Sequence, residues 1–411
     1  MKKIFSLSLI IALLLASVLP SEACTSAIFT GKSTPDGRPL LWKHRDTGEL
    51  NNRIEYFPAG KGRKYGFLGL VNSPVQDGEV WTGTNEVGFS IMNTASYNLQ
   101  SEPADLEDQE GVLMYKALGS CKTLKDFENL LDKMKKPRGI EANFGVIDAE
   151  GGAAYYEVNN TEWRKIDVND PKIAPEGFLV YTNHSYTGRK DEGMGYVRYN
   201  TANEIIHKAW IRGEEFTPLW IFNHLSRSYY NSLLGIDLNR NPELAPDGWF
   251  VDQDFIPRRS TSASIVVKGV KPGENPDLTV MWTILGYPPC GIAVPLFTAM
   301  GADQPDYMLK GSGKGNNCKM CDWALERRAK VFPLKRGNGK NYLNVAAAFE
   351  FMVESAWREE WHDVIKMGDL MEEMYEKRTF NKKACSDFYK EFSPFITSFS
   401  VEAEKVEVEK E

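Results

Sequence analysis

The amino-terminal 24 residues constrain this chain more than any other feature of its sequence. Two lysines are followed by an apolar run from Ile4 to Leu19. This run is shorter than the roughly 20 residues that a membrane-spanning helix needs. Small residues at Ser21 and Ala23 occupy the −3 and −1 positions of a signal-peptide cleavage site. We therefore expect residues 1–23 to be a cleaved secretory signal, with an uncleaved membrane anchor as the alternative.

The expected cut would make Cys24 the first residue of the mature chain. An amino-terminal cysteine carries a thiol and an α-amine, and the amine, with an unperturbed pKa of about 7.7–8.0, is partly neutral near pH 7. The amine can take the proton of the thiol, so one residue can supply both nucleophile and base. Two other roles compete: an ordinary buried cysteine, and a lipoprotein cysteine, for which Ser21 is a poor match to the large apolar residue usual at −3.

A β-hairpin is expected directly after Cys24. Residues 25–30 are rich in β-forming side chains, turn-forming residues follow, and a second apolar run begins at Leu40. With the turn residues at the hairpin centre, antiparallel pairing places Cys24 opposite a residue between 46 and 49. The charged residues 43–46 therefore return to the neighbourhood of Cys24, where a carboxylate can hold an α-ammonium and a cation favours the thiolate.

The residues of this hairpin resemble the start of the N-terminal-nucleophile (Ntn) hydrolases that act on linear amides. The chain is most similar to peptidase family C45, the acyl-CoA:6-aminopenicillanate acyltransferases. Related groups are the choloylglycine hydrolases (penicillin V acylase and bile salt hydrolase) and the C69 cysteine dipeptidases. The family usually has Arg where this chain has Lys43, so Arg45 is an alternative source of that charge. The resembling elements are Cys24-Thr25-Ser26, Gly31-Lys32, Asp36-Gly37 and the Arg/Lys-x-x-Asp element from Lys43 to Asp46.

Further motifs follow in the family's order as far as about residue 295. Asn93 falls where the family places an oxyanion-hole asparagine, and Asn183 matches a second asparagine that serves the oxyanion. A site arginine before a later strand is matched by Arg259, with the adjacent Arg258 as the alternative. The other matching elements are the turn Asn85-Glu86-Val87-Gly88, the hairpin with strands at 143–147 and 154–157, and Tyr181-Thr182-Asn183-His184.

The resemblance implies acyl transfer through a thioester, without cofactor or metal. The thiol would attack a linear amide carbonyl, asparagine side chains would hold the oxyanion, and a carboxylate would position the α-amine. Water or an amine acceptor would then resolve the thioester. The alternatives are a C69-type dipeptidase and a non-catalytic envelope lipoprotein that is lipidated at the same cysteine. The residues assigned to the catalytic site are Cys24, Asp46, Asn93, Asn183, Lys43 and Arg259.

The secondary-structure pattern combines many hairpins with long helices, which suits two packed antiparallel sheets flanked by helices. The resemblance implies the same α+β class, a four-layer αββα sandwich. We expect one Ntn-hydrolase domain over residues 24–400, with core motifs at 24–295 and a helical extension at 300–390, and then a charged tail at 401–411. Strands are expected at 26–30, 40–43, 79–83, 88–93, 143–147, 153–158, 178–183, 263–268 and 279–285. Helices are expected at 111–119, 123–134, 197–210, 217–227 and 344–376.

Composition limits the kinds of partner that this protein can bind. A net charge of −7 argues against a broad nucleic-acid surface, and no segment after residue 23 is apolar over the length of a membrane span. Cys318 and Cys321 are spaced like two metal ligands, but a zinc site needs about four and no second close pair exists, so we expect a local disulfide or free thiols. The expected partner is a small-molecule amide substrate met in the periplasm or outside the cell. The sequence leaves the oligomeric state open.

Overall fold

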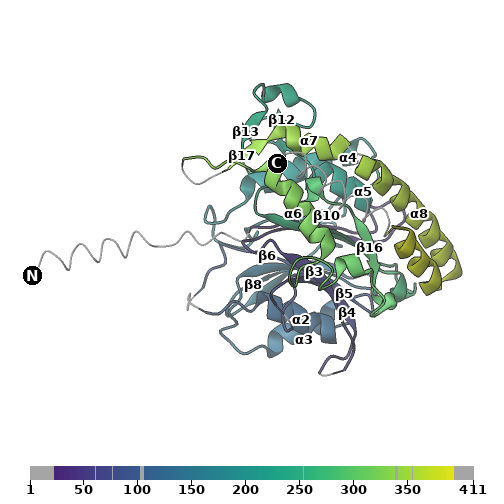
Figure 1. Cartoon of the computed structure of the whole chain (residues 1–411). Helices are drawn as coiled ribbons and strands as arrows, with labels where there is room; N and C mark the ends of the chain where they lie inside the picture. The colour runs from purple at the N-terminus through teal and green to yellow at the C-terminus, as the bar shows by residue number, and fades with distance from the viewer. Residues whose placement is uncertain are drawn as a thin grey trace, which may run out of the picture.

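Two antiparallel sheets form the centre of the molecule, and helices cover the outer face of each (Figure 1). The computed structural model describes residues 23–392 apart from 61, 76, 102–105, 253, 338–340 and 354. The expected signal peptide, except for Ala23, and the charged tail at 401–411 lie outside the described residues. The layer order is helix, sheet, sheet, helix, which confirms the predicted αββα sandwich.

The first sheet has the strand order β10-β1-β2-β14-β15-β16 and is antiparallel throughout. Strand β1 lies between β2 and β10, so the segment after Cys24 is an interior strand. Every residue of β1 and β2 is buried, including the charged end of β2. Buried charges need partners inside the protein, so this strand end must be surrounded by polar groups. The bounds are β1 Thr25–Phe29, β2 Leu40–Asp46, β10 Phe178–Tyr181, β14 Thr261–Lys268, β15 Val280–Leu285 and β16 Val294–Phe297.

The second sheet is a meander in which each strand pairs with the next along the chain, from β3 to β9. Its inner face packs on the first sheet, where Tyr155 Oη lies 3.2 Å from Ser26 Oγ. Lys43 crosses in the same direction and donates to the Trp81 oxygen at 2.7 Å. The bounds are β3 Asn52–Phe57, β4 Phe67–Asn72, β5 Thr82–Asn85, β6 Ser90–Ala95, β7 Ala142–Ile147, β8 Ala153–Val158 and β9 Trp163–Asp167.

Helices α2 (Glu110–Ser120) and α3 (Leu124–Lys133) cover the outer face of the second sheet (Figure 1). Thr123 and Asp126 form a capping box at the start of α3, which satisfies amide groups that the helix leaves unpaired. On the other side, α4 (Tyr196–Ile211), α5 (Pro218–Ile221) and α8 (Ser355–Lys377) cover the first sheet. The remaining helices are α6 Lys319–Val331, α7 Val345–Val353 and a helix over residues 382–392.

The connections between these layers contain short elements. A π-helix, Phe222–Ser226, continues α5. The two-stranded sheets pair β11 with β12 and β13 with β17. None of the described helices combines the length and the apolar character that crossing a membrane requires. The short strands are β11 Tyr230–Asn231, β12 Ile236–Asp237, β13 Trp249–Val251 and β17 Tyr342–Asn344, and the 3-10 helices are Pro242–Leu244, Pro276–Leu278, Pro288–Cys290, Thr298–Met300 and Asp306–Met308.

The nine predicted strands are all present, with bounds shifted by up to three residues, and the predicted helices are present as well. The prediction for 344–376 is covered by α7 and α8, whose outer bounds, Val345 and Lys377, each lie one residue from the predicted ones. The sequence reading missed β3, β4, β9, β16 and α6. In β3 and α6 charged residues interrupt the apolar pattern, and the structure buries Arg53 and Arg328 among backbone oxygens, which local periodicity cannot reveal.

Candidate active site

Cys24 precedes β1 and lies between two strand ends. Residue Thr25 pairs with His44 on β2, and Ser26 pairs with Tyr181 on β10. Continuing the first register by one residue and the second by two places Cys24 opposite Arg45 on one side and opposite Asn183 on the other. The thiol residue is 6% exposed.

The predicted partner of Cys24, a residue between 46 and 49, was therefore wrong by one position. Phe29 pairs with Leu40, so the hairpin centre falls between 34 and 35. The cause is an extra turn directly after β1. Thr30 N donates to the Gly177 oxygen at 2.7 Å, and Ser33 N donates back to the Thr30 oxygen at 3.0 Å. The first bond continues the pairing of β1 with β10 by one residue, and the second closes a turn that makes the loop asymmetric about its turn residues.

Side chains alternate along each strand, so the site has two levels. Ser26 and Lys43 point between the sheets, and Cys24 falls on the same level by alternation. Thr25 and Asp46 point the other way, toward the helices that cover the first sheet. The main chain at Cys24 separates the two levels, and polar groups surround it on both.

Asp46 is the centre of the helix-side level. Its carboxylate is fully buried and accepts from Thr261 Oγ1 at 2.6 Å and from Arg258 Nε at 2.9 Å. Arg258 also donates to Asp254 at 2.8 Å. The main-chain oxygen of Asp46 accepts from Ala23 N at 3.2 Å, so Asp46 adjoins the peptide that the expected cut would break.

Arg258, not Arg259, reaches the site. The Arg259 side chain is exposed, and its main-chain oxygen accepts from Arg328. The sequence-based choice of Arg259 was therefore wrong, because the adjacent Arg258 is the arginine that pairs with Asp46. The reason is a turn before β14, in which Thr261 N donates to the Arg258 oxygen at 2.9 Å and Arg258 N donates to Thr261 Oγ1 at 3.0 Å.

Arg198 on α4 is a site residue that sequence reasoning missed. Its buried guanidinium donates to the Cys24 oxygen at 2.8 Å, to Thr25 Oγ1 at 2.9 Å and to Asn183 Oδ1 at 2.8 Å. Nε donates to Asp254 at 3.0 Å. One signal was available, because position 198 shares a helix face with small and apolar residues four and eight positions later, and an arginine in such a stripe needs a buried partner.

Asn183 is oriented by this contact. Because Oδ1 accepts from Arg198, the opposite end of the amide is fixed as the donor, and Nδ2 donates to the Ala95 oxygen at 3.0 Å. The main-chain oxygen of Asn183 accepts from Met194 N at 3.1 Å. Arg198 therefore fixes the orientation of the amide that lies opposite Cys24.

Lys43 and Asn93 meet between the sheets. Lys43 Nζ donates to Asn93 Oδ1, and Asn93 Nδ2 donates to the Glu110 carboxylate at the start of α2. An amide nitrogen carries two hydrogens, and the Glu110 contact uses one of them. Arg45 lies on the same face of β2, with its guanidinium 4.8 Å from the centre of the Trp81 ring. Both cations that the sequence offered for this position are therefore buried in the inter-sheet level.

Burial and neighbouring charges set the protonation of the helix-side groups. Burial lowers the pKa of His44 to about 4, against the opposing effect of Asp46. Burial would also lower the pKa of Arg258, but the adjacent Asp46 and Asp254 raise it above its usual value. The arginines of the site are therefore charged near pH 7, while His44 is neutral there.

The other cysteines do not join this site. Cys318 and Cys321 are free thiols at the start of α6, and they contact the main chain of Asn52 and Leu50. Burial raises the pKa of Cys321 to about 12, so this thiol is not a ready nucleophile. Within the described part of the chain, no group of three or more His, Cys, Asp or Glu residues is placed to hold a metal ion.

Comparisons with known proteins return amide-cleaving enzymes. No protein-family model and no curated protein matches the chain. Among solved structures it is similar to a Caenorhabditis elegans ortholog of N-acylethanolamine-hydrolyzing acid amidase (14% identity, TM-score 0.39, covering 60% of this chain and 92% of that one). It is also similar to penicillin V acylase from Agrobacterium tumefaciens (13% identity, TM-score 0.38, covering 67% of this chain and 86% of that one). A mutant of conjugated bile acid hydrolase from Clostridium perfringens is similar as well (14% identity, TM-score 0.39, covering 67% of this chain and 92% of that one).

These are Ntn hydrolases, the group that the motifs resemble. The two choloylglycine hydrolases named from the motifs, penicillin V acylase and bile salt hydrolase, are both represented among them. At such low identities and scores, the likeness carries no argument about residues or substrate. The roles proposed for individual residues rest on the geometry of the site itself.

Proposed function

We propose that this chain is an exported cysteine amidase or acyltransferase that cleaves a linear C–N amide bond, such as that of an acyl-amino acid. The observation that carries the proposal is the position of Cys24, between the oriented amide of Asn183 and the Asp46–Arg258 ion pair. A thiol opposite an oriented amide, with a buried carboxylate on the other side of its own main chain, suits a nucleophile whose α-amine is the base.

The proposed reaction forms and breaks one thioester. The Cys24 sulfur bonds to the amide carbonyl carbon, and the α-amine of Cys24 takes the thiol proton. Asn183 Nδ2 and Asn93 Nδ2 donate to the oxyanion, each worth on the order of 3 kcal/mol in the transition state. The C–N bond then breaks as the ammonium returns its proton to the leaving amine. Water or an acceptor amine attacks the thioester and releases Cys24.

The reaction needs the expected cut, because a peptide bond to Ala23 removes the basic α-amine. Ala23 is itself buried, 3% exposed, and its main-chain nitrogen is bonded to the Asp46 oxygen. Its removal would leave space for substrate beside Cys24 and would place the new α-amine near Asp46 and Arg258. Activity is therefore coupled to processing, by signal peptidase or by self-cleavage.

Replacing Cys24 tests this proposal. Purified processed protein would be assayed against acyl-amino acids, penicillin V, bile salt conjugates and dipeptides. We expect turnover of one class, its loss in Cys24→Ala and Cys24→Ser, and far-ultraviolet circular dichroism unchanged from wild type. Full turnover in Cys24→Ala would disprove the mechanism. Turnover of dipeptides alone would assign the C69-type alternative.

The second candidate is a non-catalytic lipoprotein with a lipid on Cys24. Burial of Cys24 and the bond from Arg198 to its main-chain oxygen disfavour it, because a lipidated cysteine must leave the folded domain to reach a membrane. The intact mass of the mature protein separates the two. A bare amino-terminal Cys24 supports the enzyme, and a lipid adduct supports the anchor.

A further inference from the structure

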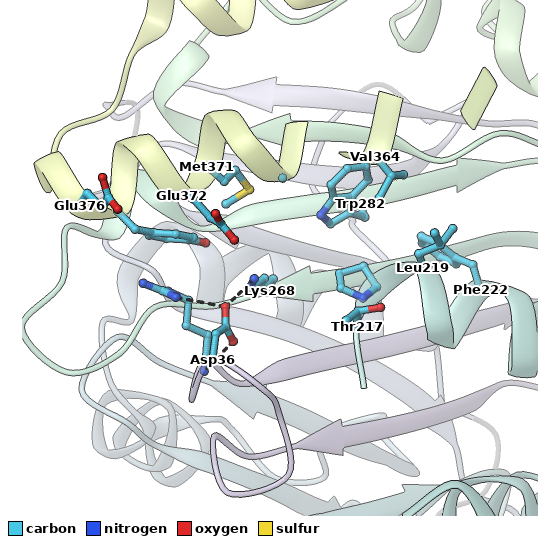
Figure 2. Close-up of a pocket in the computed structure, with 14 residues that line it drawn as sticks. Asp36, Thr217, Leu219, Phe222, Lys268, Trp282, Val364, Met371, Glu372 and Glu376 are labelled. Carbon is cyan, nitrogen blue, oxygen red and sulfur yellow. Dashed lines mark hydrogen bonds and ion pairs between the residues drawn. The ribbon is translucent and has the colours of Figure 1, made fainter. Parts of the chain in front are cut away.

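A cavity of about 420 Å³ lies between α8 and the outer face of the first sheet (Figure 2). It is far from Cys24. Lys268, which lines the cavity, lies five residues along β14 from Ala263, which pairs with Arg45, the residue opposite Cys24. At about 3.3 Å per residue, this is a separation of roughly 17 Å along the strand. The volume falls within the range of about 300–1,000 Å³ typical of small-molecule sites.

Most of the cavity wall is apolar. Figure 2 shows Trp282 from the sheet facing Val364 and Met371 of α8, and α5 contributes Leu219 with Phe222 after it. Aliphatic and aromatic side chains of this kind bind a hydrocarbon chain by removing its surface from water. An apolar wall alone does not name a ligand, so the remaining features of the cavity decide its chemistry.

A missing side chain on α8 keeps the cavity open. Gly368 lies inside this helix, where glycine is disfavoured relative to alanine. A Cβ atom built at Gly368 would meet no heavy atom within 4 Å, so close packing does not explain the glycine. The position lines the cavity, and a large side chain there would occupy the space that a ligand needs.

The two cations at the polar end of the cavity are already paired. Asp36 bridges Lys268 at 2.6 Å and Arg38 at 3.0 Å, as the dashed lines in Figure 2 show. Arg38 also binds Glu274 at 2.6 Å. An anionic ligand would have to compete with carboxylates for these cations, so the cavity is poorly suited to a carboxylate or phosphate head.

Two further polar groups lie at this end of the cavity. The buried Tyr375 hydroxyl has no hydrogen-bond partner among the residues that the structure describes. Glu372, three residues before Tyr375 on α8, is exposed and forms no ion pair within the same residues, and Figure 2 shows its carboxylate turned toward Lys268 and Asp36. The buried hydroxyl needs an acceptor, and the carboxylate at the cavity mouth can accept from a donor, so the two together favour a ligand that offers both.

We propose that this cavity binds a single-chain amphiphile whose uncharged head both accepts and donates hydrogen bonds, such as a primary amide or an alcohol. The chain would lie along Trp282 and Met371, and the head would accept from Tyr375 and donate to Glu372. A carboxylate head cannot donate to Glu372, and an ammonium head has no acceptor for Tyr375. The site is separate from Cys24, and this proposal does not rest on the proposed catalysis.

Calorimetric titration of the processed protein with decanamide, decanoate and decylammonium tests the head group. The three probes share a chain length and differ in charge. We expect decanamide to bind at least about tenfold more tightly than the other two, as the loss of a hydrogen bond to the buried Tyr375 hydroxyl or to the Glu372 carboxylate predicts. Tightest binding of decanoate or decylammonium, or no binding of decanamide, would overturn the proposal.

Two variants locate the binding. Gly368→Trp should weaken decanamide by at least about tenfold by filling the cavity, while the matched control Gly368→Ala should keep it within about twofold. Tyr375→Phe removes the hydroxyl and keeps the ring, and it should weaken the binding of decanamide by about three- to tenfold. Unchanged affinity in both Gly368→Trp and Tyr375→Phe would place the ligand elsewhere and refute the site.

Discussion

Arg198 donates a hydrogen bond of 2.8 Å to the main-chain oxygen of Cys24, across 174 positions of the chain. The same guanidinium holds Asn183 Oδ1 at 2.8 Å. One buried cation on α4 therefore fixes both the residue that carries the thiol and the amide proposed to face the oxyanion. Burial lowers the pKa of Arg198, with Arg258 adding to the decrease and Asp254 opposing it, and arginine remains charged at any working pH.

Replacing Arg198 should affect catalysis and stability together. In Arg198→Met we expect kcat to fall by about 10²-fold, because the Asn183 amide loses its fixed orientation. The free energy of unfolding should fall by about 2–4 kcal/mol, because buried acceptors lose their donor. Arg198→Lys should recover part of the stability but little of kcat, since an ammonium cannot reproduce the planar fork. Urea unfolding and amide turnover measure the two effects.

The matched control for that experiment is Thr25→Val. It removes one Arg198 partner, the Thr25 hydroxyl, and leaves the contacts to Cys24 and Asn183 in place. We expect its kcat to stay within about threefold of wild type, in line with the loss of a single hydrogen bond. A wild-type kcat in Arg198→Met would contradict the positioning role.

Replacing the two adjacent arginines before β14 should have very different effects on kcat and stability. Arg258→Gln leaves the buried Asp46 carboxylate without its guanidinium partner, so we expect kcat to fall by at least about tenfold and stability by about 2 kcal/mol. Arg259→Gln changes an exposed side chain and should leave both within error. The same turnover and urea measurements apply to the pair. Equal losses in the two variants would show that Asp46 does not depend on Arg258.

His44 should make the protein sensitive to acid. Its pKa is about 4 when folded and 6.5 when exposed, so below pH 6.5 the unfolded chain binds a proton that the folded protein does not. Stability is therefore lost as the pH falls from 6.5 toward 4, by up to about 3 kcal/mol. In His44→Gln the slope of unfolding free energy against pH should flatten over this range, as urea titrations at pH 7, 5.5 and 4 would measure.

The exposed His207 provides the control for the pH experiment. His207→Gln removes a histidine from the surface of α4 and should leave the slope as in wild type. A slope that is unchanged in His44→Gln as well would mean that another buried group causes the acid sensitivity.

Replacing each of two glycines by alanine should change the stability of the protein in opposite directions. Gly368→Ala places a methyl group in open space within α8, so we expect a gain of about 0.5–1 kcal/mol from helix propensity. Gly286→Ala requires a Cβ 2.5 Å from the Ala324 Cβ at a φ of +75°, so we expect a loss of about 1–3 kcal/mol. Thermal unfolding of both variants measures the contrast. A destabilised Gly368→Ala would show that the cavity wall is less open than the structure has it.

Local signals in the sequence predicted much of the fold. The turn residues between two apolar runs placed the hairpin that carries Cys24 and Asp46 on neighbouring strands, and Thr123 with Asp126 placed the start of α3. Such signals act between residues close in the chain. They predicted the pairing register of Cys24 less well, because a turn bonded to the distant Gly177 shifted the register by one.

The sequence by itself determined the αββα class, the hairpin after Cys24 and the candidate residues Asp46, Asn93 and Asn183. Only the tertiary structure decided which of two adjacent arginines faces Asp46, and it alone brought Arg198 to Cys24. The physical reason is that a local pattern fixes backbone conformation, while the direction of a side chain at a strand end depends on its partners in space. A register shift on β14 between Thr261 and Ala263 and a helix packed across the sheet set those directions here.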